Sequence, residues 1–197
     1  MKKFWKIIIF IFVAGIMVGD VLIDYRSQVQ AHPQENQVAE LQNRDVGIAV
    51  GDLAPEFSGT TIDGKAVSLS DLDGKLVVVN VFASWCGPCR VETPHLVEIY
   101  NEIDKDEVEF VGLNLQETSE AVLSFKEEFS ITYPLLLNEG GEITNIYRPI
   151  GLPTTWFIDQ EGIIRFTFSG PLTKESLQVI LGDVAAGREP DPFAVIG

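Results

Sequence analysis

Both cysteines of the 197-residue chain lie in one short motif, Trp85-Cys86-Gly87-Pro88-Cys89. Two cysteines at this spacing bond to each other, bind a metal together with ligands from elsewhere, or exchange with the disulfide of a partner. A metal site would need further ligands, and the only histidines are His32 and His95. A purely structural disulfide usually closes a longer loop, because its entropic benefit grows with loop size. The motif therefore favours a redox site, with a metal site and a static disulfide as alternatives.

The segments on either side of the motif place it where a strand turns into a helix. Residues 76–82 are almost all apolar, which is typical of a strand buried on both faces. Residues 90–100 have the pattern of a helix. Backbone N–H groups and the helix dipole at this junction favour a thiolate at Cys86. We therefore expect Cys86 to be exposed and to attack the substrate disulfide, and Cys89 to be the more buried, resolving thiol.

The remaining pattern predicts an α/β fold with a central mixed sheet flanked by helices. A hairpin is expected over residues 56–68, with its turn at Asp63-Gly64, and the cysteine helix is expected to end near residue 104. Ser119 and Thr173 are candidate N-caps of two later helices. Further strands are expected at 108–115, 135–137, 154–158 and 163–168, and further helices at 119–129, 142–147 and 173–186.

The first 24 residues are expected to form an N-terminal transmembrane anchor. Residues 4–23 are mostly apolar, and as a helix they would span about 30 Å, the thickness of a bilayer core. Lysines lie on the N-terminal side, and Asp20 and Asp24 follow, which favours a cytoplasmic N-terminus and a domain outside the cytoplasm. A signal peptide is the alternative, although the candidate cleavage site at residues 29–31 lies far beyond the apolar run.

The rest of the chain divides into three parts. Residues 25–48 are polar and rich in glutamine, which predicts a linker. The folded domain is expected over residues 49–187, and a tail containing two prolines over residues 188–197. The formal net charge of −15 argues against a nucleic-acid partner.

These residues resemble the thioredoxin superfamily, and within it the membrane-anchored TlpA/ResA-like branch. The cysteine motif follows an apolar strand, and Pro94 lies five residues after Cys89 in the same helix, as in thioredoxins. Ala-Pro-Glu-Phe at residues 54–57 resembles the opening of the branch, and about 119–147 matches its αβ insertion. The resemblance covers roughly residues 48–187 and implies a thioredoxin-like fold.

A second motif of the family is expected to bind the substrate. Residues 151–155, Gly-Leu-Pro-Thr-Thr, resemble the family's cis-proline loop, which makes Pro153 the candidate cis residue. A cis proline would expose the backbone beside the sulfurs, where an extended substrate adds as a short strand. Trp85 is expected either to take part in docking or to belong to the core. The expected substrate-binding residues are Trp85, Gly87, Pro88, Leu152, Pro153 and Thr154.

Asn80 departs from the thioredoxin pattern, which has a buried aspartate six residues before the first cysteine. An asparagine cannot take a proton, so another group must assist Cys89 when it attacks the mixed disulfide. Glu92 lies three residues after Cys89 on the same helical stripe, and the TlpA/ResA-like branch has a glutamate at this position. The expected catalytic residues are therefore Cys86, Cys89 and Glu92.

The resemblance implies a thiol–disulfide oxidoreductase that acts outside the cytoplasm on a single-pass membrane anchor. The branch mostly reduces disulfides of client proteins, typically apocytochrome c during cytochrome c maturation, and a membrane thiol–electron carrier would re-reduce it. Gly-Pro between the cysteines is the dipeptide of reducing thioredoxins. The Cys86–Cys89 disulfide would be the redox group, so neither a cofactor nor a metal is expected.

Three other functions compete with this interpretation. Within the same chemistry, the chain would be an oxidase or isomerase of disulfides in secreted proteins. A thiol peroxidase is a different class, but its Thr-x-x-Cys arrangement is missing, because Ala83 stands at the threonine position. A non-catalytic binding module would dock partners through the cis-proline groove.

Overall fold

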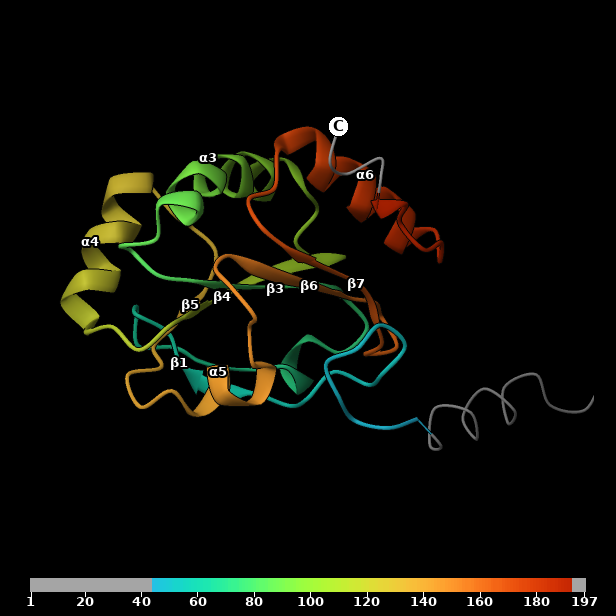
Figure 1. Ribbon diagram of the computed structural model, residues 1–197, viewed down its shortest axis with the longest axis horizontal. Coiled ribbons are helices and arrows are strands. Elements are labelled where there is room, and N and C mark those ends of the chain that lie inside the picture. Colours follow the sequence, from blue (N-terminus) through green and yellow to red (C-terminus); the bar gives the residue numbers. More distant parts are fainter. Residues whose placement is uncertain (1–43, 193–197) are drawn as a thin grey trace, which may run out of the picture. The chain divides into compact units, whose positions relative to one another are not determined.

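The computed structural model describes residues 44–192, and these form an α/β domain (Figure 1). The expected hairpin and the expected strands and helices of the domain are all present. In chain order the elements are β1 (Ser58–Thr60), β2 (Ala66–Ser68), the 3-10 helix η1 (Ser70–Leu72), β3 (Leu76–Phe82), α3 (Gly87–Glu102), β4 (Val108–Asn114), α4 (Ser119–Phe129), β5 (Leu135–Leu136), α5 (Glu142–Tyr147), β6 (Thr154–Ile158), β7 (Ile164–Ser169) and α6 (Lys174–Ala185).

A five-stranded sheet with the order β5-β4-β3-β6-β7 forms the centre of the domain. β3 pairs in parallel with β4 and antiparallel with β6. β5 extends the parallel side, and β7 extends the antiparallel side. The mixed strand direction predicted from the order of elements is thus confirmed. All residues of β3 are buried, which agrees with a central strand covered on both faces.

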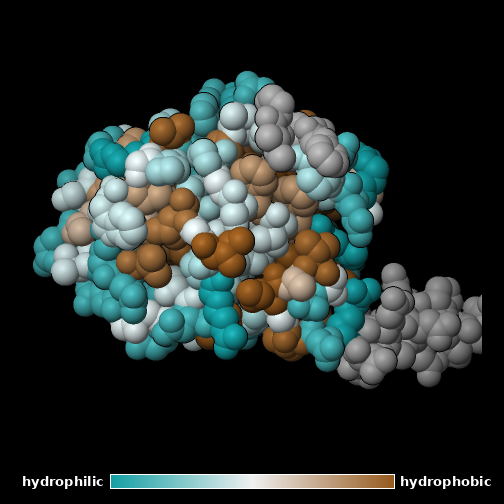
Figure 2. Space-filling model, viewed as in Figure 1, coloured by the Kyte–Doolittle hydropathy of each residue, from teal (hydrophilic) through white to brown (hydrophobic). Residues whose placement is uncertain are grey.

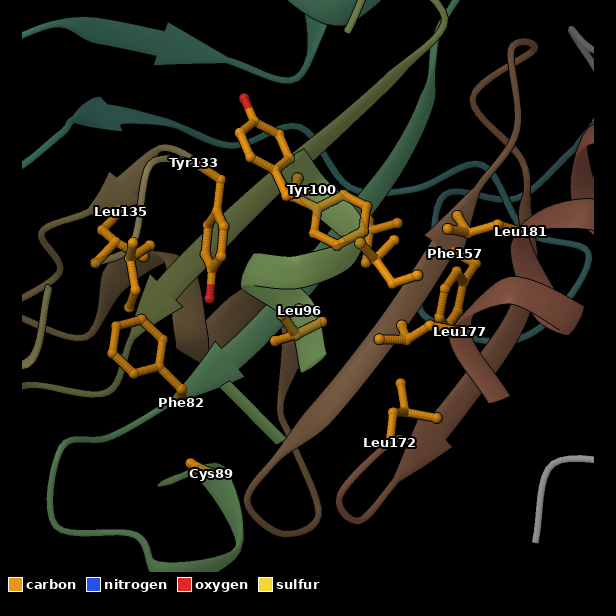
Figure 3. Packing of buried hydrophobic residues seen from close by; sticks show 14 of the residues in the cluster. Phe82, Cys89, Leu96, Tyr100, Tyr133, Leu135, Phe157, Leu172, Leu177 and Leu181 are labelled. Carbon is orange, nitrogen blue, oxygen red and sulfur yellow. The ribbon is translucent and has the colours of Figure 1, made fainter. Parts of the chain in front are cut away.

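Helices cover both faces of the sheet. α3, α4 and α6 lie on one face, and α5 lies with the β1–β2 hairpin on the other (Figure 1). Successive residues of β3 point to opposite faces, so Val78 belongs to the first core cluster and Val79 to the second. Figure 3 shows the first cluster, with Cys89 at its edge. The central strand therefore joins both cores to the start of the cysteine helix.

Two local predictions have different outcomes at the helix N-termini. Thr173 is the N-cap of α6, because its hydroxyl accepts the backbone N–H of Ser176 at 3.2 Å. The prediction of Ser119 as N-cap of α4 is wrong by one residue. Thr118 has extended backbone angles and its hydroxyl accepts the N–H of Ala121, so Ser119 already belongs to the helix.

The expected anchor, residues 1–24, and most of the expected linker lie outside the described residues. The last linker residues contact the domain: the N–H of Gly47 donates to the carbonyl of Leu53 at 3.0 Å, and the indole N–H of Trp156 donates to the carbonyl of Ile48 at 3.3 Å. Among the helices of residues 44–192, none combines the length and apolar character needed to cross a bilayer.

Gly112 of β4 marks a close approach in the first core cluster. A Cβ at this position would clash with Cδ2 of Leu135 and lie 3.2 Å from Cε1 of Phe82. Because both neighbours are buried, Gly112→Ala should lower the free energy of unfolding by about 1–3 kcal/mol in urea denaturation.

Gly182→Ala is the matched control for this substitution. Gly182 lies in α6, and a Cβ there would meet no atom within 4 Å. Alanine has a higher helix propensity than glycine, so Gly182→Ala should raise the free energy of unfolding by about 0.5–1 kcal/mol. If Gly112→Ala were as stable as Gly182→Ala, the close packing around β4 would be contradicted.

Candidate active site

The two cysteines form a disulfide at the start of α3. Cys86 is the N-cap of the helix, and its Sγ accepts the backbone N–H of Cys89 at 3.1 Å. This N–H is one of the donors that an α-helix leaves without an intrahelical acceptor. Pro88 lies in the first turn, where a missing N–H has no consequence. A contact that caps the helix can therefore also stabilise negative charge on Cys86 after reduction.

Both sulfurs are buried in this oxidised state. The expectation of an exposed Cys86 is wrong here, since only 4% of the residue is exposed, against 0% for Cys89. Its Sγ is bonded to Cys89 and accepts the N–H of Cys89, and both interactions turn it toward the helix. Cys89 is still the more buried of the two. Trp85 is 68% exposed, which excludes it from the core and leaves it available for docking.

The carboxyl group of Glu92 is completely buried one turn after Cys89. Nδ2 of Asn80 donates to its Oε1 at 2.7 Å, and the backbone N–H of Leu172 donates to its Oε2 at 3.0 Å. Burial raises the pKa of Glu92 from 4.5 to about 7, and the two hydrogen bonds act against this by favouring the charged form. Glu92 is therefore able to exchange a proton near neutral pH.

Asn80 holds Glu92 from the central strand. Besides its bond to Glu92, its Nδ2 donates to Oγ1 of Thr155 at 2.9 Å. Asn80 and Thr155 are partners in the register between β3 and β6, so the sheet itself fixes this amide. The residue at the thioredoxin aspartate position thus donates a hydrogen bond to a carboxyl group supplied by the neighbouring helix.

The cis-proline loop lies at the same end of the sheet as the disulfide. The Leu152–Pro153 peptide bond is cis, as expected. Thr154 pairs with Val81, close to the point where β3 leads into the cysteine motif. The hydroxyl of Thr154 is engaged within the protein, because it donates to the carbonyl of Gly151 at 2.8 Å.

Hydrophobic surface is available near this loop. Figure 2 shows hydrophobic residues gathered near the centre of the face it presents. Ile150, between α5 and β6, is 91% exposed, and Trp85 precedes Cys86 at the surface. Gly87 and Pro88 are also exposed. Of the expected substrate-binding residues, Trp85, Gly87 and Pro88 are exposed, and Leu152 is half-buried. Pro153 and Thr154 are buried, so the expected exposure of the Thr154 backbone beside the sulfurs is wrong for this oxidised state.

Three polar residues that no sequence motif singles out, Arg90, Asn114 and Glu117, form a hydrogen-bond network with Ser84 in the segment before Cys86. Ser84 bonds to Glu117, which follows β4, and to Arg90 of α3. Glu117 in turn bonds to Asn114 at the end of β4. Ser84 and Glu117 are far apart in sequence, so only the parallel pairing of β3 with β4 brings them together. In the sequence, the only sign of this contact is that Ser84 and Glu117 each follow shortly after a predicted strand.

The AhpC/TSA family model matches residues 50–167. Among curated relatives, the thiol-disulfide oxidoreductase ResA of Oceanobacillus iheyensis is 37% identical over 140 residues, which cover 69% of this chain and 73% of the relative. ResA of Bacillus cereus is 34% identical over 139 residues, covering 71% of this chain and 80% of the relative. These matches include the cysteine motif and most of the described domain.

Solved structures give the same result. The structure of a putative thiol:disulfide interchange protein DsbE from Chlorobium tepidum has a TM-score of 0.62 at 28% identity, and the match covers 67% of this chain and 94% of that one. StoA from Bacillus subtilis has a TM-score of 0.57 at 30% identity, covering 63% and 94%.

The matches and the geometry agree on the chemistry. The ResA relatives and the DsbE structure carry names of thiol–disulfide exchange proteins, and this chain has a disulfide at the strand–helix junction and a cis proline at the same end of the sheet. The chain is a thiol–disulfide oxidoreductase and belongs to the thioredoxin-like AhpC/TSA family, among relatives of the ResA type.

Proposed function

We propose that this enzyme reduces disulfides of client proteins outside the cytoplasm, with apocytochrome c as the leading candidate. The observation that carries the proposal is the buried carboxyl of Glu92, one helical turn from the resolving cysteine and with a pKa near 7. Such a group can take the proton of Cys89 when that thiol attacks the mixed disulfide at neutral pH. The relatives are named thiol-disulfide oxidoreductases, and the Gly-Pro dipeptide supports reduction of a client as the direction.

In the proposed reaction, the thiolate of Cys86 attacks one sulfur of the client disulfide. The client S–S bond breaks, and the sulfur that leaves takes up a proton. Cys89 then gives its proton to the carboxylate of Glu92 and attacks Sγ of Cys86. The second client sulfur leaves and takes that proton from Glu92. Two electrons have passed to the client, and the Cys86–Cys89 disulfide of the structure is the product state.

The surroundings of the disulfide are assigned to docking. Trp85 and the backbone of Leu152 would contact an extended client segment, with Gly87 and Pro88 forming the adjacent surface. The side chain of Leu152, which is half-buried, would contact the same client segment. The predicted anchor over residues 1–24 would keep the domain at the outer face of the cell membrane, where a membrane thiol–electron carrier would restore the dithiol.

The reductase activity is tested with an apocytochrome c that carries an intramolecular disulfide. The reduced wild-type domain should open this disulfide, and Cys86→Ser should not. Cys89→Ser should stop at a covalent complex through Cys86, because the resolving thiol is absent. Mass spectrometry of the products identifies each case.

The reduction potential of the same protein tests the direction of electron flow. A value near that of thioredoxin, about −270 mV, agrees with a reductase. A value above about −180 mV would instead support an oxidase or isomerase. Appreciable turnover of peroxide would point to a thiol peroxidase. Full cellular function in a variant without either cysteine would point to a non-catalytic binding module.

Glu92→Gln should slow resolution of the mixed disulfide roughly 100-fold at pH 8, because glutamine cannot accept the proton of Cys89. In the wild type, the rate of resolution should rise with pH through about 7, as the carboxyl group loses its proton. The variant should lack this step. Release of a fluorescent client peptide in stopped flow measures both rates, with the exposed Glu98→Gln as control. Equal rates for wild type and Glu92→Gln across pH 6–9 would remove Glu92 from the mechanism.

The stability of the oxidised protein should also depend on Glu92. Its pKa is about 7 in the folded state, against an ordinary value of 4.5. Between these values the folded state binds more protons than the unfolded state, so the free energy of unfolding falls as pH rises. The loss is about 3 kcal/mol once pH exceeds 7. In urea denaturation, the free energy of unfolding of Glu92→Gln should not show this loss. If the free energies of unfolding of wild type and variant differed by the same amount at every pH, the raised pKa would be contradicted.

A further inference from the structure

Ser84 lies in the short segment between β3 and α3, two residues before Cys86. Its backbone N–H donates to Oε2 of Glu117 at 2.7 Å, and its hydroxyl donates to Oε1 of the same carboxylate. Its carbonyl accepts a hydrogen bond from Nη1 of Arg90 at 3.2 Å. Every polar group of Ser84 is therefore bonded to an ionisable side chain. The N–H and the hydroxyl contact an acidic side chain, and the carbonyl contacts a basic one.

The carboxylate of Glu117 is held firmly in this position. Nδ2 of Asn114 donates to its Oε2 at 2.7 Å, and the N–H of Glu117 donates back to Oδ1 of Asn114 at 2.9 Å. Asn114 is fully buried at the end of β4 and pairs with Phe82 at the end of β3. The sheet thus fixes a carboxylate beside the segment that leads to Cys86.

The guanidinium of Arg90 is fixed from the opposite side. It forms an ion pair with Glu128 of α4. It also lies over the rings of Phe125 and Phe129, with its central carbon 5.8 and 5.1 Å from their centroids. Arg90 directly follows Cys89, so this cation connects α4 to the first turn of the cysteine helix.

Neither charge takes part in the proposed proton transfer, but both are bonded to Ser84, two residues before the sulfur that becomes charged during catalysis. The cysteines of the disulfide are neutral, and Cys86 becomes a thiolate only after reduction. A fixed carboxylate nearby disfavours that thiolate, and a fixed guanidinium favours it. The two side chains therefore act in opposite directions on the same sulfur while they hold the same serine.

We propose that Glu117 and Arg90 are positioning residues that hold the Ser84–Cys86 segment and balance the charge on the attacking sulfur. The proposal rests on the thiol–disulfide oxidoreductase activity and not on the identity of the client. Glu117 makes the reduced form less stable and a stronger electron donor. Arg90 has the opposite effect and keeps enough thiolate for attack. The balance between them sets the reactivity of Cys86 in the dithiol state.

Other ionisable groups belong to the helices that carry the disulfide and Arg90. Glu92 and His95 lie in α3, and Glu128 of α4 forms the ion pair with Arg90. The test variants leave all three unchanged.

The test measures the ionisation of Cys86 in the reduced full-length chain. The rate of alkylation by iodoacetamide is followed against pH, and mass spectrometry identifies the modified cysteine. Glu117→Gln should lower the pKa of the Cys86 thiol by about half a unit, which is about threefold in rate below that pKa. Arg90→Gln should raise it by a similar amount. Equilibration with glutathione should show a higher reduction potential for Glu117→Gln and a lower one for Arg90→Gln.

Opposite shifts of the Cys86 thiol pKa in Glu117→Gln and Arg90→Gln distinguish an effect of charge from a loosening of the segment before Cys86. If the side chains only held the segment in place, both substitutions would disturb Cys86 in the same way. Arg90→Lys should restore the wild-type thiol pKa, because it keeps the charge. Shifts in the same direction, or a shift in Arg90→Lys as large as in Arg90→Gln, would overturn the proposal. If melting curves show that Glu117→Gln is unfolded, the comparison of Arg90→Gln with Arg90→Lys decides the question.

Glu98→Gln and Lys174→Gln are the matched controls. These residues pair with each other at 2.7 Å, and Glu98 lies roughly 18 Å from Cys86 along α3. They change the net charge by the same amounts without touching Ser84, so the thiol pKa should stay at the wild-type value. Test variants that shift no more than these controls would also overturn the proposal.

Discussion

The buried carboxyl group of Glu92 is the point at which three distant parts of the chain meet. It lies on α3, accepts a hydrogen bond from Asn80 of β3, and accepts another from the N–H of Leu172 ahead of α6. Burial of a carboxyl group is unfavourable unless its oxygens are bonded, and here each oxygen has one donor. The cysteine helix, the central strand and the final helix are thereby held around one group that changes its charge near pH 7.

This constraint gives the two cysteines unequal roles. Cys86 caps the helix and receives the N–H of Cys89, so its negative charge is stabilised by the helix start. Cys89 is fully buried and lies one turn from a carboxyl group, so its thiolate is disfavoured until Glu92 can accept a proton. The attacking sulfur and the resolving sulfur thus differ because of fixed surroundings, although they belong to one short motif.

Local patterns were sufficient to predict the strand before the motif, the helix after it and the place of Glu92, because each depends on neighbouring residues. The resemblance supplied the cis bond at Pro153. Two features could not be predicted, since they depend on contacts between distant elements. One is the burial of Cys86 in the oxidised state, and the other is the bonding of Ser84 to Glu117 across the β3–β4 register. The N-cap of α4 was missed by one residue because Thr118 and Ser119 are adjacent and both residue types cap helices.

The most direct test of this account is an NMR titration of the oxidised protein with ¹³C-labelled glutamate side chains. The carboxyl signal of Glu92, assigned by its absence in Glu92→Gln, reports the protonation of that group alone. The account predicts a midpoint near pH 7, because burial outweighs the hydrogen bonds from Asn80 and Leu172. A midpoint near the ordinary value of 4.5 would contradict it, since Glu92 would then remain charged at neutral pH and would be a poor acceptor for the proton of Cys89.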